Sequence, residues 1–192
     1  MSLALVIMIY IVKIAFYLYS FALLMRIILH FLHADEYNAI SQFIIKITQW
    51  PVQKFKTFLP VTSRFDFAAI GVLVVVELVK VYLLVGLELG RFANIIGVLL
   101  YSVGDLLWVV LDIYFYAIII AAIISWVRPA TQSALVQIVN YFAEPVLRLF
   151  RRFIPPLGGF DLSPIAAIVA IKVIEYLVVG LVFIRLAMHF IA

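Results

Sequence analysis

Four charged residues stand inside two long apolar stretches, and they are the residues of this sequence best suited to do chemistry. Glu77 and Lys80 are three positions apart in one stretch, and Lys172 and Glu175 are three apart in the other. If these stretches cross a membrane, ionisable side chains at that depth are costly and often belong to an ion path. Opposite charges at this spacing can also pair along one helix and serve packing alone. The pattern therefore predicts an intramembrane charge cluster and leaves its use open.

An internal repeat relates the two halves of the chain. When the segment around Pro51 is aligned with the segment around Pro145, Asp66 falls on Asp161, at a separation of 94 or 95 residues. Self-similarity at a fixed spacing indicates repeated structural units. We therefore expect two repeats, residues 1–90 and residues 91–192.

The alignment exchanges the signs of the charged residues, because Glu77 matches Lys172 and Lys80 matches Glu175. Two arrangements fit this pattern. Glu77 could pair with Lys172, and Lys80 with Glu175, where the second and fourth spans meet near a pseudo-two-fold axis. Alternatively, Glu77 could pair with Lys80 and Lys172 with Glu175, each within one helix. This arrangement requires no contact between the repeats.

The composition is typical of a membrane protein. Of 192 residues, 68% are hydrophobic and 12% are charged, whereas soluble domains have about half and about a quarter. A bilayer core of about 30 Å requires about 20 apolar residues per helix. Residues 92–104 are also apolar and would lie in the interface or extend the third span. Four stretches meet the length requirement: residues 5–31, 67–87, 105–126 and 165–191.

These stretches predict an all-α integral membrane protein with four transmembrane helices. Each repeat would consist of a span, an amphipathic interfacial helix and a second span, and the two repeats would be parallel. The long loops 32–66 and 127–163 are rich in lysine and arginine. The short connection between the second and third spans has only Arg91. The positive-inside rule therefore places both long loops in the cytoplasm and both termini on the opposite side.

Each long loop contains a helical pattern with one apolar stripe. We expect these stripes to lie in lipid while the basic residues reach the headgroups. Pro51 and Pro145 each remove a backbone donor, so each helix should be kinked or split. The stripe of the second loop comprises Leu135, Ile138, Val139, Phe142, Val146, Leu149, Phe150 and Phe153. The residues expected to bind anionic headgroups or a partner are Lys54, Lys56, Arg148, Arg151 and Arg152.

The stretch RRFIPPLGGFDLSP, residues 151–164, has the residue types of a turn into the last span. A serine hydroxyl caps free helix amides and proline suits the first turn, so Ser163 and Pro164 predict a helix start. Asp161 would place negative charge at the positive end of that helix. The glycine pair lacks the spacing of a nucleotide-binding loop. The predicted hinge residues are Pro155, Gly158, Gly159, Asp161, Ser163, Pro164 and, in the first repeat, Asp66.

Other polar residues of the spans are weaker candidates. Asp105 and Asp112 are seven apart and share a helix face, and Lys13 of the first span could pair with Asp112, with Arg26 as the alternative partner. Four metal-ligand types follow the first span, and we interpret them as a solvated helix end rather than a metal site. They are His30, His33, Asp35 and Glu36.

Two motifs resemble a known family. The order SWVRP at residues 125–129, then EPVLRLFRRFIPPLGGFDLSP at residues 144–164, followed by an apolar helix, is similar to the YggT/YlmG family of small membrane proteins. The resemblance covers both halves, and the second half is the closer match. It implies a bacterial inner-membrane protein associated with osmotic tolerance, with potassium uptake or with cell division. It implies no catalytic residue.

Three classes of function follow from the sequence. The first is a non-enzymatic membrane scaffold that contacts anionic lipids and other membrane proteins or a second copy of itself. The second is an ion-conducting or transport-modulating protein that uses the intramembrane charges. An enzyme ranks last, because no nucleophile and base occur at a recognisable spacing. We expect no cofactor, and nothing indicates nucleic acid as a partner.

Overall fold

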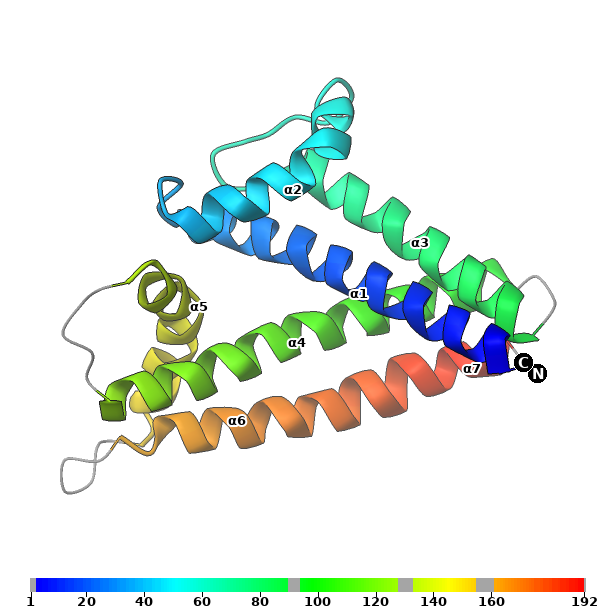
Figure 1. Ribbon diagram of the computed structural model, residues 1–192. Helices are drawn as coiled ribbons and strands as arrows, with labels where there is room; N and C mark the ends of the chain where they lie inside the picture. The colour runs from blue at the N-terminus through cyan, green and yellow to red at the C-terminus, as the bar shows by residue number, and fades with distance from the viewer. Residues whose placement is uncertain (1–2, 90–93, 128–132, 155–160, 192) are drawn as a thin grey trace.

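Helices make up most of the described part of the chain. The computed structural model describes residues 3–89, 94–127, 133–154 and 161–191 (Figure 1). Four helical segments are long and apolar enough to cross a membrane. They are α1 (Leu3–Phe31), α3 (Phe67–Leu89), α4 (Ile95–Val127) and a last segment formed by α6 (Ser163–Ile174), η1 (Glu175–Ile184) and α7 (Arg185–Ile191). The all-α, multi-pass membrane fold predicted from the sequence is confirmed.

The third span is one continuous helix. α4 has 33 residues and includes Ile95–Gly104, the part for which an interfacial position was the alternative. At about 1.5 Å per residue it is about 50 Å long, which exceeds a bilayer core of about 30 Å. In the last span, η1 has π-helical geometry over ten residues. Such wide turns are uncommon and often occur at functional sites.

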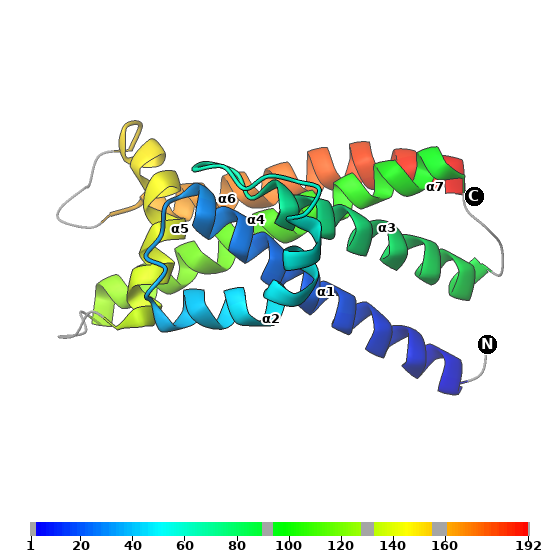
Figure 2. The same ribbon diagram turned by 90° about the horizontal axis from the view of Figure 1, so that it is seen from above.

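The two ends of the bundle differ. The start of α1 and the end of α7 lie at one end, which we call the terminal end (Figure 1). The two shorter helices, α2 (Ala39–Phe55) and α5 (Ala134–Arg151), lie at the opposite end, which we call the loop end (Figures 1 and 2). α4 packs against α1, α3 and the last span. Among the spans, it is therefore the main contact of the second repeat with the first.

Asn38 ties the two short helices together. Its side-chain oxygen accepts a hydrogen bond from the Ile40 amide at 2.9 Å and so caps α2. Its Nδ2 donates to the Ala134 carbonyl at 3.0 Å and to Gln137 Oε1 at 3.1 Å at the start of α5. One buried amide thus starts one helix and holds the start of the other.

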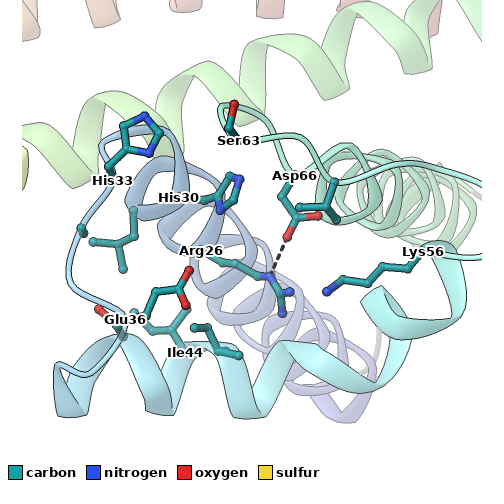
Figure 3. A pocket seen from close by; sticks show the side chains of 13 residues that line it. Arg26, His30, His33, Glu36, Ile44, Lys56, Ser63 and Asp66 are labelled. Carbon is teal, nitrogen blue, oxygen red and sulfur yellow. Dashed lines mark hydrogen bonds and ion pairs between the residues drawn. The ribbon is translucent and has the colours of Figure 1, made fainter.

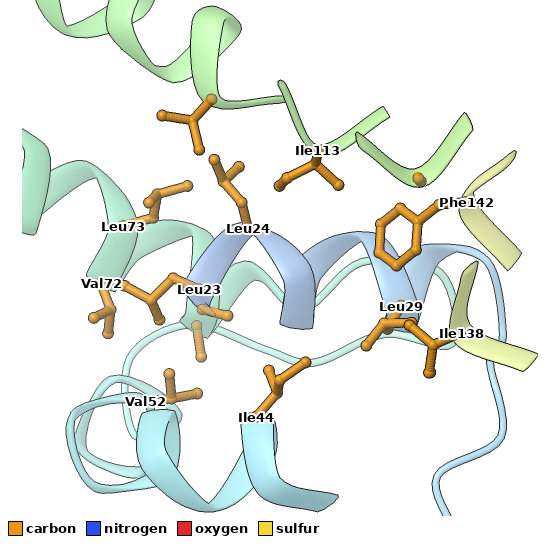
Figure 4. Packing of buried hydrophobic residues seen from close by; sticks show 14 residues of the cluster. Leu23, Leu24, Leu29, Ile44, Val52, Val72, Leu73, Ile113, Ile138 and Phe142 are labelled. Atoms are coloured by element: carbon orange, nitrogen blue, oxygen red, sulfur yellow. The ribbon is translucent and has the colours of Figure 1, made fainter. Parts of the chain in front are cut away.

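The main core lies at the loop end and includes both short helices. Leu23, Leu24 and Leu29 of α1 face apolar residues of α2, α3, α4 and α5 (Figure 4). Phe142 of α5 is 1% exposed and packs edge-on against Tyr114 at 6.1 Å. The expectation that the whole α5 stripe lies in lipid is therefore wrong at its centre, because the bundle itself covers Ile138, Val139 and Phe142. Only the ends of the stripe are well exposed, at Leu135, Leu149 and Phe153.

Neither internal proline splits its helix. Pro51 lies inside α2 and Pro145 lies inside α5, and both helices continue through them. A proline removes a single backbone hydrogen bond. The packing of Val52 and Leu147, which are both buried, holds the following turn in place.

Candidate functional site

The first intramembrane charge cluster joins α1, α3 and α4. Lys80 Nζ lies 2.5 Å from Glu77 Oε1 on its own helix and 2.5 Å from Asp105 Oδ2 on α4. Ser20 of α1 donates to Glu77 Oε2 at 3.3 Å. Glu77 is fully buried and Lys80 is 5% exposed, whereas the Asp105 side chain is 29% exposed. One lysine compensates the charge of only one of the two carboxylates, while contacting both.

The second charge cluster joins α4 to the last span. Lys172 Nζ lies 2.6 Å from Glu175 Oε2 and 3.5 Å from Asp112 Oδ1. The ammonium also lies 4.1 Å from the centre of the Phe115 ring, within the range of a cation–π contact. The Lys172 side chain is 43% exposed. This cluster is therefore more open than the first.

Of the two arrangements left open by the sequence, the structure has pairing within each helix. Among the described residues, no ion pair joins Glu77 to Lys172 or Lys80 to Glu175. α4 packs against both α3 and the last span and gives each of them an aspartate. The expected single cluster is therefore two separate clusters, and α4 contributes one aspartate to each.

Two further ion pairs differ from expectation. Lys13 lies 2.5 Å from Glu88 near the terminal end, so the predicted pair with Asp112 is not formed. Arg26, the alternative partner, is also engaged elsewhere. Its Nε donates to Asp66 at 3.1 Å and its Nη1 to Thr48 at 3.1 Å. Asp112 is instead within reach of Lys172.

Asp66 starts α3 and is buried against Arg26. Its Oδ1 accepts the Ala69 amide at 3.0 Å, while Oδ2 accepts from Arg26. A carboxylate at this position satisfies a free helix amide and the positive helix end. The predicted helix-start role of Asp66 thus includes an ion pair to the preceding span.

Asp161 has the matching place before α6 but a different cation. Arg151 of α5 donates to Asp161 Oδ2 at 2.9 Å and to Glu144 at 3.0 Å. Partial burial alone would raise the pKa of Asp161, but the hydrogen bonds from Arg151 and Ser163 hold it below its usual value. The hydrogen bond to Asp161 correspondingly raises the pKa of Arg151. Arg151 thus connects α5 to the start of the last span.

A comparison with known protein families places the chain in one of them. The CCB3/YggT family model matches residues 5–87 and 100–182. The chain belongs to the CCB3/YggT family. The two matched segments support two tandem YggT repeats, as the sequence motifs indicated.

Two of the relatives found cover most of the chain, and a third covers about a third of it. An uncharacterized protein of Pseudomonas aeruginosa is 37% identical over 90% of this chain and 88% of its own length. The uncharacterized protein YggT of Escherichia coli K12 is 31% identical over 82% of this chain and 81% of its own. YlmG homolog protein 2 of Arabidopsis thaliana, named chloroplastic, is 39% identical over 32% of this chain and 24% of its own. No solved structure matches the chain.

The start of the last span in the second YggT repeat corrects one expectation. Ser163 is the first residue of α6 rather than its side-chain cap, and its amide donates to Asp161 Oδ1 at 2.9 Å. Its hydroxyl lies 3.5 Å from the Ile154 carbonyl, pointing back toward α5. Pro164 is in the first turn as predicted. The remaining hinge residues, Pro155, Gly158 and Gly159, lie outside the described residues.

The basic residues predicted to reach headgroups divide into two groups in the YggT fold. Arg148 and Arg152 are exposed on α5 and just after it, and Lys54 Nζ lies 3.9 Å above the exposed Trp50 ring of α2. Arg151 is committed to its two carboxylates, and Lys56 lines a cavity beside Arg26 and Asp66. Their contact with lipid or a partner stays a prediction.

Several polar residues of the YggT repeats were missed by sequence reasoning. Ser20 and Thr48 each contribute a hydroxyl to a buried charged group. A lone hydroxyl in an apolar segment gives no signal of its partner. The Arg26–Asp66 pair could have been predicted from the sequence, because the two opposite charges stand at the same end of consecutive spans. In the described part of the chain, no group of three or more His, Cys, Asp or Glu residues could hold a metal ion.

Proposed function

We propose that this YggT-family protein is a non-enzymatic scaffold of the bacterial inner membrane that organises anionic lipids at its loop end. The observation that carries this proposal is the pairing of two amphipathic helices there. α2 and α5 pack together and are joined through Asn38. Each ends in basic residues, and such helices attract anionic headgroups. Osmotic-stress and cell-division roles would then follow from arranging the membrane and its proteins.

The outer surface of the short helices suits an interfacial position. Trp50 is 71% exposed on α2, and Phe58 and Phe153, which follow the two helices, are also exposed. Aromatic rings favour the boundary between lipid and water. Arg148 and Arg152 provide charge beside them. This combination supports contact with headgroups in the cytoplasmic leaflet, under the orientation predicted from the positive-inside rule.

The intramembrane charges support a packing role in this proposal. Lys80 contacts two carboxylates and Lys172 contacts two more, so each cation is compensated by its neighbours. Both clusters join α4 to another span. Paired charges of this kind fix which helices meet.

A lipid-retention experiment tests the scaffold proposal. The protein would be extracted from mixed bilayers of phosphatidylglycerol and phosphatidylcholine, and retained lipid would be quantified by mass spectrometry. We expect the K54Q/R148Q/R152Q variant to retain several-fold less phosphatidylglycerol. R185Q, which removes an exposed arginine in α7 far from the loop end, is the control. Equal retention by the triple variant and the wild type would reject the proposal.

Ion conduction is the second candidate, and one observation favours it. A crevice of about 280 Å³ lies on α4 between the two charge clusters and is lined by Tyr17, Tyr101, Asp105 and Asp112. Polar groups facing a cavity at membrane depth can form part of an ion path. Potassium flux into proteoliposomes, abolished in an E77Q/K80M/K172M/E175Q variant, would favour conduction. Absence of flux in the wild type would favour the scaffold.

A further inference from the structure

A polar cavity opens at the loop end of the first repeat and is distinct from both charge clusters. Its volume is about 450 Å³, within the usual range for small-ligand sites. It lies between the end of α1, α2 and the segment that leads into α3 (Figure 3). The polar residues that line it are Arg26, His30, His33, Glu36, Ser41, Lys56, Ser63 and Asp66.

Ser41 has a buried hydroxyl that the protein does not satisfy. The residue is 4% exposed and lines the cavity. Its Oγ makes no hydrogen bond to the described part of the protein. Buried polar atoms are nearly always hydrogen-bonded, and exceptions call for an explanation. A polar ligand in the cavity supplies one.

Arg26 gives the cavity a rigid, charge-neutral floor. Its guanidinium is held by Asp66 and Thr48 (Figure 3). His30 is also fixed, with Nε2 2.9 Å from the Thr62 carbonyl. Since a carbonyl only accepts, this contact makes Nε2 the donor and turns the other ring nitrogen into an acceptor in the neutral ring. Arg26 and His30 are therefore positioned before a ligand binds.

Two opposite charges remain at the edges of the cavity. Glu36 and Lys56 both line it, and neither forms an ion pair with any residue in the described ranges. They lie on opposite sides of Arg26 in Figure 3. A simple anion would leave Glu36 repelling it, and a simple cation would leave Lys56 repelling it. A zwitterion satisfies both.

We propose that this cavity binds a zwitterionic amino-phosphate group, with its phosphate beside Lys56 and Arg26 and its ammonium beside Glu36. The Ser41 hydroxyl adds one hydrogen bond. The chemistry is that of phosphoethanolamine, either as the headgroup of a phospholipid or as a free molecule. The site is tested separately from the proposed contact with anionic lipids, whose variants change Lys54, Arg148 and Arg152.

The second repeat provides an internal comparison. At the repeat spacing of 95 residues, Ala121 stands where the first repeat has Arg26, and Val136 stands where it has Ser41. Arg151, which matches Lys56, is occupied by Asp161 and Glu144. The site is therefore specific to the first repeat, and one ligand per chain is expected.

Binding of defined probes to the full-length protein in detergent tests the proposal. Free phosphoethanolamine and phosphoglycerol would be titrated calorimetrically, and phosphatidylethanolamine and phosphatidylglycerol would be added in native mass spectrometry. We expect one ethanolamine-containing ligand per chain, with affinity reduced about tenfold or more in K56Q and in E36Q because each removes a charged contact. S41A should weaken binding less, and R148Q, an exposed arginine on α5, should leave it unchanged.

The outcomes separate the sources of the ligand and can overturn the site. Binding of the phospholipid alone supports a headgroup site, and binding of the free compound supports a soluble ligand. Equal binding of the glycerol compounds, or no effect of E36Q, overturns the zwitterion assignment. Absence of binding by all four probes overturns the site. Because Glu36 and Lys56 are exposed, their variants should fold, and unchanged thermal unfolding would verify this.

Discussion

Lys80 of α3 and Asp105 of α4 form an ion pair of 2.5 Å across the interface between the two repeats. Lys80 simultaneously contacts Glu77, which is fully buried. One ammonium thus stabilises two carboxylates that would otherwise repel each other. We therefore expect loss of this lysine to weaken the interface between the repeats more than loss of either acid.

The first prediction concerns removal of that lysine. K80M leaves Glu77 and Asp105 without their cation, and breaking a buried pair in this way costs about 3–5 kcal/mol. D105N should destabilise the protein less than K80M, because Lys80 still pairs with Glu77 in that variant. The free energy of unfolding in mixed micelles, measured by denaturant titration, checks both. K13M is the comparison, since the Lys13–Glu88 pair lies near the terminal end, is far less buried than Lys80 and should cost less to remove. Equal losses in K80M and K13M would contradict the assignment.

The second prediction separates the two arrangements that the repeat alignment allows. If Glu77 and Lys172 were partners, reversing both charges would restore what either single reversal damages. In the structure they belong to different clusters, so the double variant E77K/K172E should be about as unstable as the two single variants added together. A double-mutant cycle on unfolding free energies measures the coupling. Rescue in the double variant would show that the two spans meet.

The spans and the repeat could be predicted from the sequence because they depend on local properties. Length and hydropathy alone define where α1 and α3 cross the bilayer, but they left the start of α4 open. Contacts between helices depend on which helix faces pack together. An alignment of the repeats does not show this. Glu77 and Lys172 occupy matching positions, yet α4 supplies each cluster with its own aspartate. Likewise, an amphipathic stripe is the same pattern whether lipid or a neighbouring helix covers it, so the burial of Phe142 was not foreseeable.

The third prediction concerns the close approach of α4 and η1. A Cβ on Gly104 would lie 2.8 Å from Phe183 Cβ and 2.9 Å from Ile184 Cδ1. G104A should therefore destabilise the protein by about 1–3 kcal/mol, the usual cost of overpacking. G86A is a matched control in α3, where a Cβ meets nothing within 4 Å, and it should be neutral or stabilising by up to about 1 kcal/mol. Unfolding midpoints in detergent compare the two. An unchanged unfolding midpoint for G104A would mean that α4 and η1 can move apart to accommodate the methyl group.

The fourth prediction is a pH dependence at the start of α6. The pKa of Asp161 is held below its usual value by Arg151 and Ser163. A carboxyl whose pKa is lower in the folded state adds stability above its unfolded pKa, about 3.9, and that stability is lost as the pH falls through the folded pKa. The attachment of α6 to α5 should therefore be constant between about pH 5 and 8 and should weaken below about pH 4.

Amide hydrogen exchange of residues 163–170, corrected for intrinsic rates, measures this attachment. D161N should weaken protection at neutral pH and remove the step below pH 4, because the charged acceptor is gone. E144Q is the control, since it removes the other carboxylate of Arg151 but leaves the Arg151–Asp161 pair of 2.9 Å intact. If the wild type and D161N lost protection in parallel between pH 3 and 5, another carboxyl group would control the start of the last span.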